Sequence, residues 1–151
     1  MTAAIAFLLP DEPNGFLSNW SAHPIEVDGL RWPTVEHYFQ AMKFPDDEAH
    51  RERIRAEADP ERAKAVAYES TALRAGWDVM RDQVMLTALR AKFTQHEDLR
   101  RQLLATGEAE LVEVNPGDGY WGDGGDGSGA NRAGRLTMQV RAEMLQCEEE
   151  T

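Results

Sequence analysis

The sequence contains one cysteine, no excess of basic residues and no long apolar run. Cys147 is the single cysteine of the sequence, which excludes a disulfide framework and a zinc site built from several cysteines. No stretch reaches the about 18 apolar residues of a membrane-spanning helix, and the first residues do not combine a basic region with an apolar run as a secretory signal does. We therefore expect a cytoplasmic protein that does not contact a membrane.

Acidic residues outnumber basic residues, 27 to 16, and give a net charge of −11. A protein whose main ligand is nucleic acid normally presents a basic surface that replaces the counterions of the phosphates. A small anionic nucleotide needs only a local pocket of cations and hydrogen-bond donors. The charge therefore favours a free metabolite over a nucleic acid polymer.

The length of 151 residues predicts one domain over residues 1–151, with an acidic C-terminal tail at about 146–151. The patterns predict an α+β fold that is mostly helical with a small β-sheet. Asp28-Gly29 predicts a type I′ turn, Thr34 predicts a helix N-cap and Gly76 predicts a helix end. Strands are expected at residues 5–9, 25–27, 30–32 and 111–114, and helices at residues 35–43, 46–57, 60–74, 78–93 and 98–105 and around residues 136–144.

One predicted helix combines an apolar stripe with a row of three polar side chains. Glu36 and Lys43 are seven residues apart, which is two helical turns, so they share a face with Gln40 between them. The opposite stripe of Val35, Tyr38, Phe39 and Met42 has the spacing of a buried face. The polar row is either an ordinary solvent-exposed face or a binding surface.

Eight of the 12 glycines lie between residues 117 and 134. Glycine lets the backbone approach a ligand closely, so this segment is either a phosphate or ribose cradle or, at residues 124–129, a mobile surface loop. Its G-x-G-x-x-G match does not open a helix, which makes a dinucleotide site of the Rossmann type improbable on the sequence. The spacing of Asp123 and Asp126 does not fit a calcium loop, and the four histidines have no metal-ligand spacing. We expect neither a metal nor a cofactor.

Several motifs, taken together, resemble one known family. They are Phe16-Leu-Ser-Asn19-Trp20, Trp32-Pro-Thr-Val-Glu36-His-Tyr-Phe-Gln40-Ala-Met-Lys43-Phe44, Ala91-Lys-Phe93, Asp118-Gly-Tyr-Trp121-Gly122 and Gly129-Ala-Asn131-Arg-Ala-Gly134. In this order they resemble the NADAR or YbiA-like family, whose name refers to NAD and ADP-ribose. The resemblance implies an N-glycosidase that cleaves ribosylamino-pyrimidine intermediates of riboflavin synthesis or removes ADP-ribose from guanine.

The resemblance also suggests roles for individual residues. Glu36 would be the carboxylate that stabilises an oxocarbenium-like transition state, kept ionised by its place in the first turn of a helix. Lys43 would neutralise a phosphate or attack C1 of the sugar and hold it as a Schiff base. Asp118 would be a second acid or base. The substrate-binding residues would be Asn19, Trp20, Gln40, Trp121, Gly122 and Asn131, although Trp121 also fits a core position.

The chain departs from the family pattern at Arg74-Ala-Gly76-Trp77, where an aspartate usually precedes the tryptophan. The choice of substrate therefore stays open between a phosphorylated ribosyl-base and an ADP-ribosylated nucleotide. Nucleic acid would be a substrate only through ADP-ribosylated guanine. The alternative function is a non-catalytic module that binds ADP-ribose or NAD, in which Glu36 and Lys43 would be structural.

Overall fold

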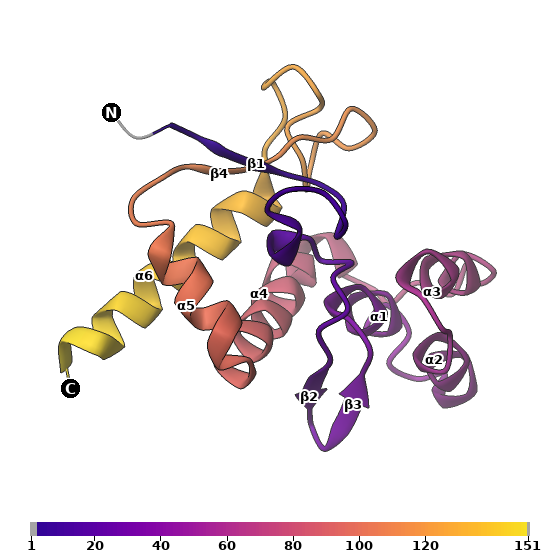
Figure 1. Ribbon diagram of the computed structural model, residues 1–151. Coiled ribbons are helices and arrows are strands. Elements are labelled where there is room, and N and C mark those ends of the chain that lie inside the picture. Colours follow the sequence, from indigo (N-terminus) through magenta and orange to yellow (C-terminus); the bar gives the residue numbers. More distant parts are fainter. Residues whose placement is uncertain (1–2, 151) are drawn as a thin grey trace.

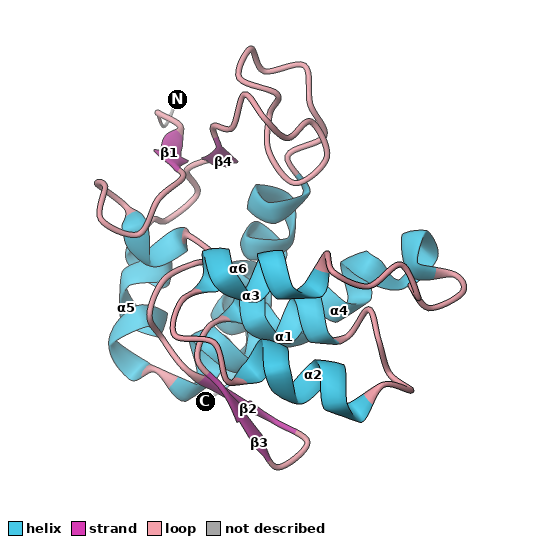
Figure 2. Cartoon of the chain, turned by 90° about the vertical axis from the view of Figure 1, so that its right-hand side faces the viewer, coloured by secondary structure: helices cyan, strands magenta, loops and turns pink. Residues whose placement is uncertain are grey.

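A computed structural model describes residues 3–150 of the chain. Helices form most of the regular secondary structure, and two separate two-stranded sheets lie at opposite ends of the helical body (Figures 1 and 2). The predicted α+β class is confirmed, with the small sheet content divided in two. The elements are β1 (Ile5–Phe7), a 3-10 turn (Gly15–Leu17), β2 (Ile25–Val27), β3 (Leu30–Trp32), α1 (Val35–Ala41), α2 (Glu48–Arg55), α3 (Pro60–Ala67), α4 (Trp77–Gln95), α5 (Glu97–Ala105), β4 (Leu111–Glu113) and α6 (Arg132–Glu150).

The two sheets bring together different parts of the chain. β2 and β3 form the predicted hairpin, and the positive φ angles of Asp28 and Gly29 fit the predicted turn. β1 pairs in parallel with β4, with Ile5 opposite Leu111. This long-range pair places the start of the chain beside the glycine-rich segment (Figure 1).

Local signals set several helix ends. The hydroxyl of Thr34 accepts a hydrogen bond from the backbone N–H of His37, and the carboxylates of Asp47 and Asp59 cap α2 and α3 in the same way. α1 is buried along its whole length, including Glu36, His37 and Gln40, because it packs against α2, α3 and α4. The interpretation of the polar row as a solvent-exposed face is therefore wrong.

Other predicted boundaries were wrong. α3 ends at Ala67 instead of continuing to about Arg74, because residues 68–76 cross back to the end of α1, where the backbone N–H of Arg74 donates to the carbonyl of Lys43. Gly76 is the left-handed N-cap of α4 and not the stop of α3. The expected acidic tail is the last turn of α6 up to Glu150; Thr151 lies outside the described residues.

Candidate active site

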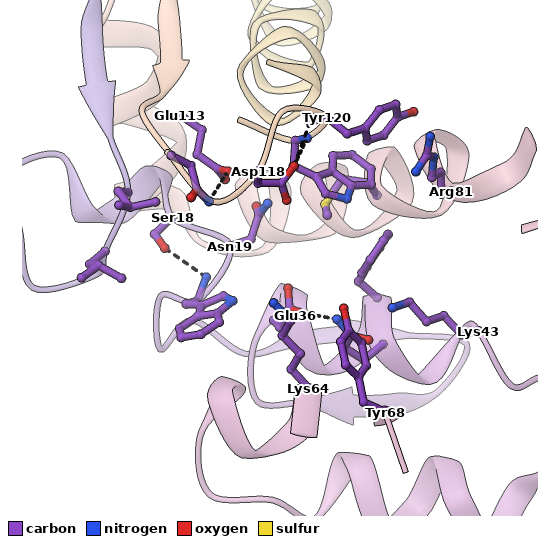
Figure 3. Close-up of a pocket in the computed structure, with 18 of the residues that line it drawn as sticks. Ser18, Asn19, Glu36, Lys43, Lys64, Tyr68, Arg81, Glu113, Asp118 and Tyr120 are labelled. Carbon is purple, nitrogen blue, oxygen red and sulfur yellow. Dashed lines mark hydrogen bonds between the residues drawn. The ribbon is translucent and has the colours of Figure 1, made fainter. Parts of the chain in front are cut away.

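A cavity of about 540 Å³ opens where the N-terminal segment, α1, α3, the start of α4 and the loop after β4 meet. Figure 3 shows the side chains of this cavity, with Glu113, Asp118 and Tyr120 on one wall and Glu36, Lys43, Lys64 and Tyr68 on the other. Of the predicted site residues it brings together Asn19, Trp20, Glu36, Gln40, Lys43, Asp118 and Trp121. The cavity is also lined by residues that no sequence pattern singled out as site residues: Lys64, Tyr68, Arg81, Glu113, Asn115 and Tyr120.

Glu36 lies on the cavity wall with 8% of its surface exposed. Its Oε1 accepts a hydrogen bond of 2.6 Å from Nε2 of Gln40, and its backbone N–H donates to the carbonyl of Asn19. Burial raises the pKa of Glu36, whereas the Gln40 amide, the charges of Lys64 and Lys43 and the Trp20 indole act in the opposite direction. Desolvation of the carboxylate therefore opposes the ionised form that the helix position was expected to favour.

Gln40 leaves one polar atom without a partner. Its Nε2 is used by Glu36, and its Oε1 is buried without a hydrogen-bond partner among the described residues. A buried carbonyl oxygen without a donor is costly. Because Gln40 lines the cavity, a substrate hydroxyl or amino group would satisfy this oxygen.

Two lysines share one aromatic ring at the cavity. The ammonium of Lys43 lies 5.0 Å from the ring centre of Tyr68, and that of Lys64 lies 5.7 Å from it. Within residues 3–150, neither ammonium has a carboxylate within ion-pair distance. Burial lowers the pKa of Lys43, and the charge of Lys64 lowers it further while Glu36 raises it. Lys43 itself lies two residues beyond the end of α1 at Ala41.

A third cation lies at the start of α4. The guanidinium of Arg81 stacks 3.4 Å above the centre of the Tyr120 ring. Its Nε is buried without a hydrogen-bond partner in the described part of the chain. Tyr120 is held in turn by Asp82, which accepts from the tyrosine hydroxyl and pairs with Arg132. The cavity therefore presents three cations in a strongly acidic protein.

Asp118 and Glu113 are the acids of the opposite wall. Oδ1 of Asp118 accepts from the backbone N–H groups of Tyr120 and Trp121, so this oxygen shapes the turn. Burial raises the pKa of Glu113 to about 7, and the negative charges of Asp118, Glu36 and Asp123 add to the effect. The available signal for Glu113 was its place two residues after Leu111 on the buried face of β4.

Two predicted binding residues lie outside the cavity. The side-chain amide of Asn131 is fully used by β4, accepting from the N–H of Glu113 and donating to the carbonyl of Leu111, both at 2.9 Å. A Cβ on Gly122 would lie 2.6 Å from Cβ of Asn115 and 3.0 Å from Oε2 of Glu113, so glycine is needed there for close packing. We therefore withdraw both residues from the substrate-binding set.

The glycine-rich segment is internally hydrogen-bonded. The N–H of Gly125 donates to the side chain of Asp123, and the N–H groups of Gly124 and Gly129 donate to carbonyls of the same segment. These donors are not available to a phosphate, so at residues 124–129 the hydrogen bonds argue against the alternative that the glycine-rich segment is a phosphate cradle. Trp121, in contrast, lines the cavity and packs edge-to-face on Phe39 at 5.2 Å, so it is both a cavity residue and a packing residue.

The remaining candidates do not form a metal site or a membrane anchor in the described chain. No group of three acidic, histidine or cysteine side chains gathers in metal-binding geometry within residues 3–150. His37 has a structural environment, with its ring between the Thr34 hydroxyl and the carbonyl of Glu57. None of the helices between residues 3 and 150 combines the length and apolarity needed to cross a membrane.

Comparison with known proteins gives a consistent result. A family model described as the NADAR domain matches residues 6–145. The chain is 50% identical over 141 residues to N-glycosidase YbiA of Escherichia coli (strain K12), covering 93% of this chain and 88% of that protein. It is 42% identical over 144 residues to riboflavin biosynthesis protein VVA0006 of Vibrio vulnificus (strain YJ016), covering 95% of this chain but 39% of that protein.

The fold agrees with these relationships. The NMR structure of E. coli YbiA matches with a TM-score of 0.90 at 47% identity, covering 99% of this chain and 89% of that chain. From the match over residues 6–145, which spans the Glu36 helix, the cavity and the glycine-rich segment, we conclude that this chain belongs to the NADAR domain family.

Proposed function

We propose that this N-glycosidase hydrolyses the bond between a pyrimidine base and a phosphorylated ribose, and that it acts in the cytoplasm. The proposal depends on one observation above all. A buried carboxyl group, Glu36, shares one cavity with the ammonium groups of Lys43 and Lys64, which have no counterion among residues 3–150. The pairing fits a substrate that has an anionic phosphate and develops positive charge at its anomeric carbon.

The cations provide the binding half of this proposal. Lys64 and Arg81 would hold the phosphate, since a phosphate oxygen would satisfy the unpartnered Nε of Arg81 and the charge of Lys64. The unpartnered Oε1 of Gln40 would accept a hydrogen bond from the ribose or the base. Asn19, Trp20 and Trp121 would complete the walls around the sugar and the base.

Glu36 and Lys43 provide the chemical half. The ionised carboxylate of Glu36 would stabilise the oxocarbenium-like sugar as the base departs. Lys43 has a lowered pKa because it is half-buried next to another cation, and this arrangement makes a lysine amine nucleophilic. Its amine would capture C1 and form an imine that water then hydrolyses. Asp118 would act on the attacking water through the carboxylate oxygen that does not hold the turn.

The substrate class is supported by the relatives as well as by the cavity. The name of the Vibrio vulnificus relative places that longer protein in riboflavin biosynthesis. We therefore rank ribosylamino-pyrimidine phosphates above ADP-ribosylated guanine as substrates. The non-catalytic binding module is the less favoured function, since a buried carboxyl group beside a lysine of lowered pKa is typical of a reactive centre.

The test is to incubate the protein with a ribosylamino-pyrimidine phosphate and, separately, with an ADP-ribosylated guanine nucleotide, and to measure free base by mass spectrometry. Wild-type protein should release the pyrimidine faster, and Glu36→Gln should lower turnover by on the order of 10² or more while remaining folded. Glu110→Gln removes an exposed carboxylate and should retain wild-type turnover. Faster release of guanine would contradict the substrate assignment, and full activity of folded Glu36→Gln would contradict the role of Glu36.

A further inference from the structure

The structure fixes Glu113 more firmly than a packing role requires. Its backbone N–H donates to Oδ1 of Asn131 at 2.9 Å, and its backbone carbonyl accepts from the N–H of Asp123 at 2.9 Å. Its Oε2 accepts from Nδ2 of Asn115 at 3.2 Å, and the missing Cβ of Gly122 leaves space beside that oxygen. Asn131 and Asp123 thus hold the backbone of Glu113, while Asn115 and Gly122 adjoin its carboxyl group at the cavity wall.

The charged groups near Glu113 and those near Glu36 differ in sign. Glu36 accepts hydrogen bonds and lies near the cations Lys43 and Lys64, all of which favour a carboxylate. Among residues 3–150, the charged groups that raise the pKa of Glu113 are the acids Asp118, Glu36 and Asp123, and the hydrogen bond from the Asn115 amide acts in the opposite direction. Both side chains are at least nine-tenths buried, so solvent does not cancel this difference. When the two carboxyl groups share one proton, the proton therefore resides on Glu113.

We propose that Glu113 is the general acid of this active site and protonates the departing base, while Glu36 stays ionised. The two walls in Figure 3 place Glu113 and Glu36 on opposite sides of the cavity, as acid and stabilising carboxylate require. The inference rests on the proposed glycosidase function. It also gives Asn131, Gly122 and Asn115 a common role as positioning residues for that acid.

In the proposed step Glu113 first donates a proton and later regains one. The bond between C1 and the base nitrogen breaks and its electron pair stays on the nitrogen. Glu113 donates its proton to that nitrogen, so the base leaves in neutral form. C1 accepts a new bond from the Lys43 amine or directly from water. The water that completes the hydrolysis leaves its oxygen on the sugar and returns a proton to Glu113. A pKa of about 7 allows Glu113 to be protonated before the reaction and ionised after it at neutral pH.

The decisive experiment compares pH profiles of kcat for base release by wild type, Glu113→Gln and Glu36→Gln. A general acid must be protonated, so the wild-type rate should fall above about pH 7, and this alkaline limb should be absent in Glu113→Gln. Glu113→Gln should also lower kcat by on the order of 10². Glu36→Gln, in which Glu113 is intact, should instead keep the alkaline limb. Glu110→Gln, in the same segment but exposed, is the matched control with an unchanged profile.

The outcomes separate the two proposals. If wild-type protein releases no base from either substrate, the proposed function has failed. If wild type is active but Glu113→Gln keeps its rate within threefold of wild type, or keeps the alkaline limb, the general-acid role is overturned. If Glu113→Gln does not fold, infrared titration of the wild-type carboxyl groups replaces it. A buried carboxyl group that titrates near pH 7 supports the role, and complete ionisation by about pH 5 overturns it.

Discussion

Lys92 offers a stability test that does not depend on the substrate. It lies in α4 with none of its surface exposed, and its Nζ donates to the carbonyl of Ser18 at 2.9 Å. No carboxylate of residues 3–150 forms an ion pair with it. Burial lowers the pKa of Lys92 from 10.5 to about 7. Burial in the folded protein therefore disfavours the charged form of Lys92.

The sign and size of the effect follow from that pKa. Between about pH 7 and pH 10.5 the unfolded chain holds a proton on Lys92 that the folded chain has released. The free energy of unfolding therefore rises with pH across this window and levels off at both ends. The pKa difference corresponds to a destabilisation of about 5 kcal/mol, which applies in full below about pH 7 and disappears above about pH 10.5.

The perturbation is Lys92→Met, which keeps an unbranched side chain and removes the ammonium. The carbonyl of Ser18 also accepts from the backbone N–H of Ser21 at 3.1 Å, so the substitution does not leave it unpaired. We expect Lys92→Met to be more stable than wild type below pH 7 by up to about 5 kcal/mol. Because every other group titrates in both proteins, the difference should shrink steadily as the pH rises to 10.5.

The assay is urea unfolding at a series of pH values for wild type, Lys92→Met and the control Arg101→Met. The control removes an exposed cation and should differ from wild type by a small amount that does not change with pH. Parallel curves for wild type and Lys92→Met would refute the reasoning, because they would mean that Lys92 keeps its ordinary pKa in the folded protein. A variant less stable than wild type at every pH would show that the ammonium is compensated by its surroundings.

Two further predictions concern Lys43 and Gly134. Lys43→Arg should lower turnover by on the order of 10² while Lys64→Arg retains most of it, because an arginine can bind phosphate but cannot form an imine. Borohydride added during turnover should trap a sugar on Lys43. An active Lys43→Arg without any trapped adduct would contradict the covalent route. Gly134→Ala should lower the free energy of unfolding by about 3 kcal/mol or more, because the new Cβ would lie 2.0 Å from the carbonyl oxygen of Leu111. Gly127→Ala should cost about 1 kcal/mol in the same urea titration, because φ is +87° but no atom of residues 3–150 lies within 4 Å of the new Cβ. Equal losses at both sites would contradict the packing argument.

The sequence alone determined the features that depend on neighbouring residues. Thr34, Asp47 and Asp59 cap helices through hydrogen bonds to N–H groups three residues away, and Asp28-Gly29 sets the hairpin turn by its own backbone angles. The motif around Glu36 and Trp121 likewise identified the family, since a long motif with fixed spacing is legible without coordinates.

The tertiary structure decided what those residues do. The pairing of β1 with β4 and the return of residues 68–76 to α1 join segments far apart in the sequence, so no local pattern could predict that Lys64, Arg81 and Glu113 share a cavity with Glu36. The protonation behaviour of these side chains likewise depends on the tertiary structure. The pKa of a carboxyl or an amine depends on burial and on charges contributed by other elements, which is why the sequence did not indicate that burial raises the pKa of Glu36 and did not identify Glu113 and Lys92.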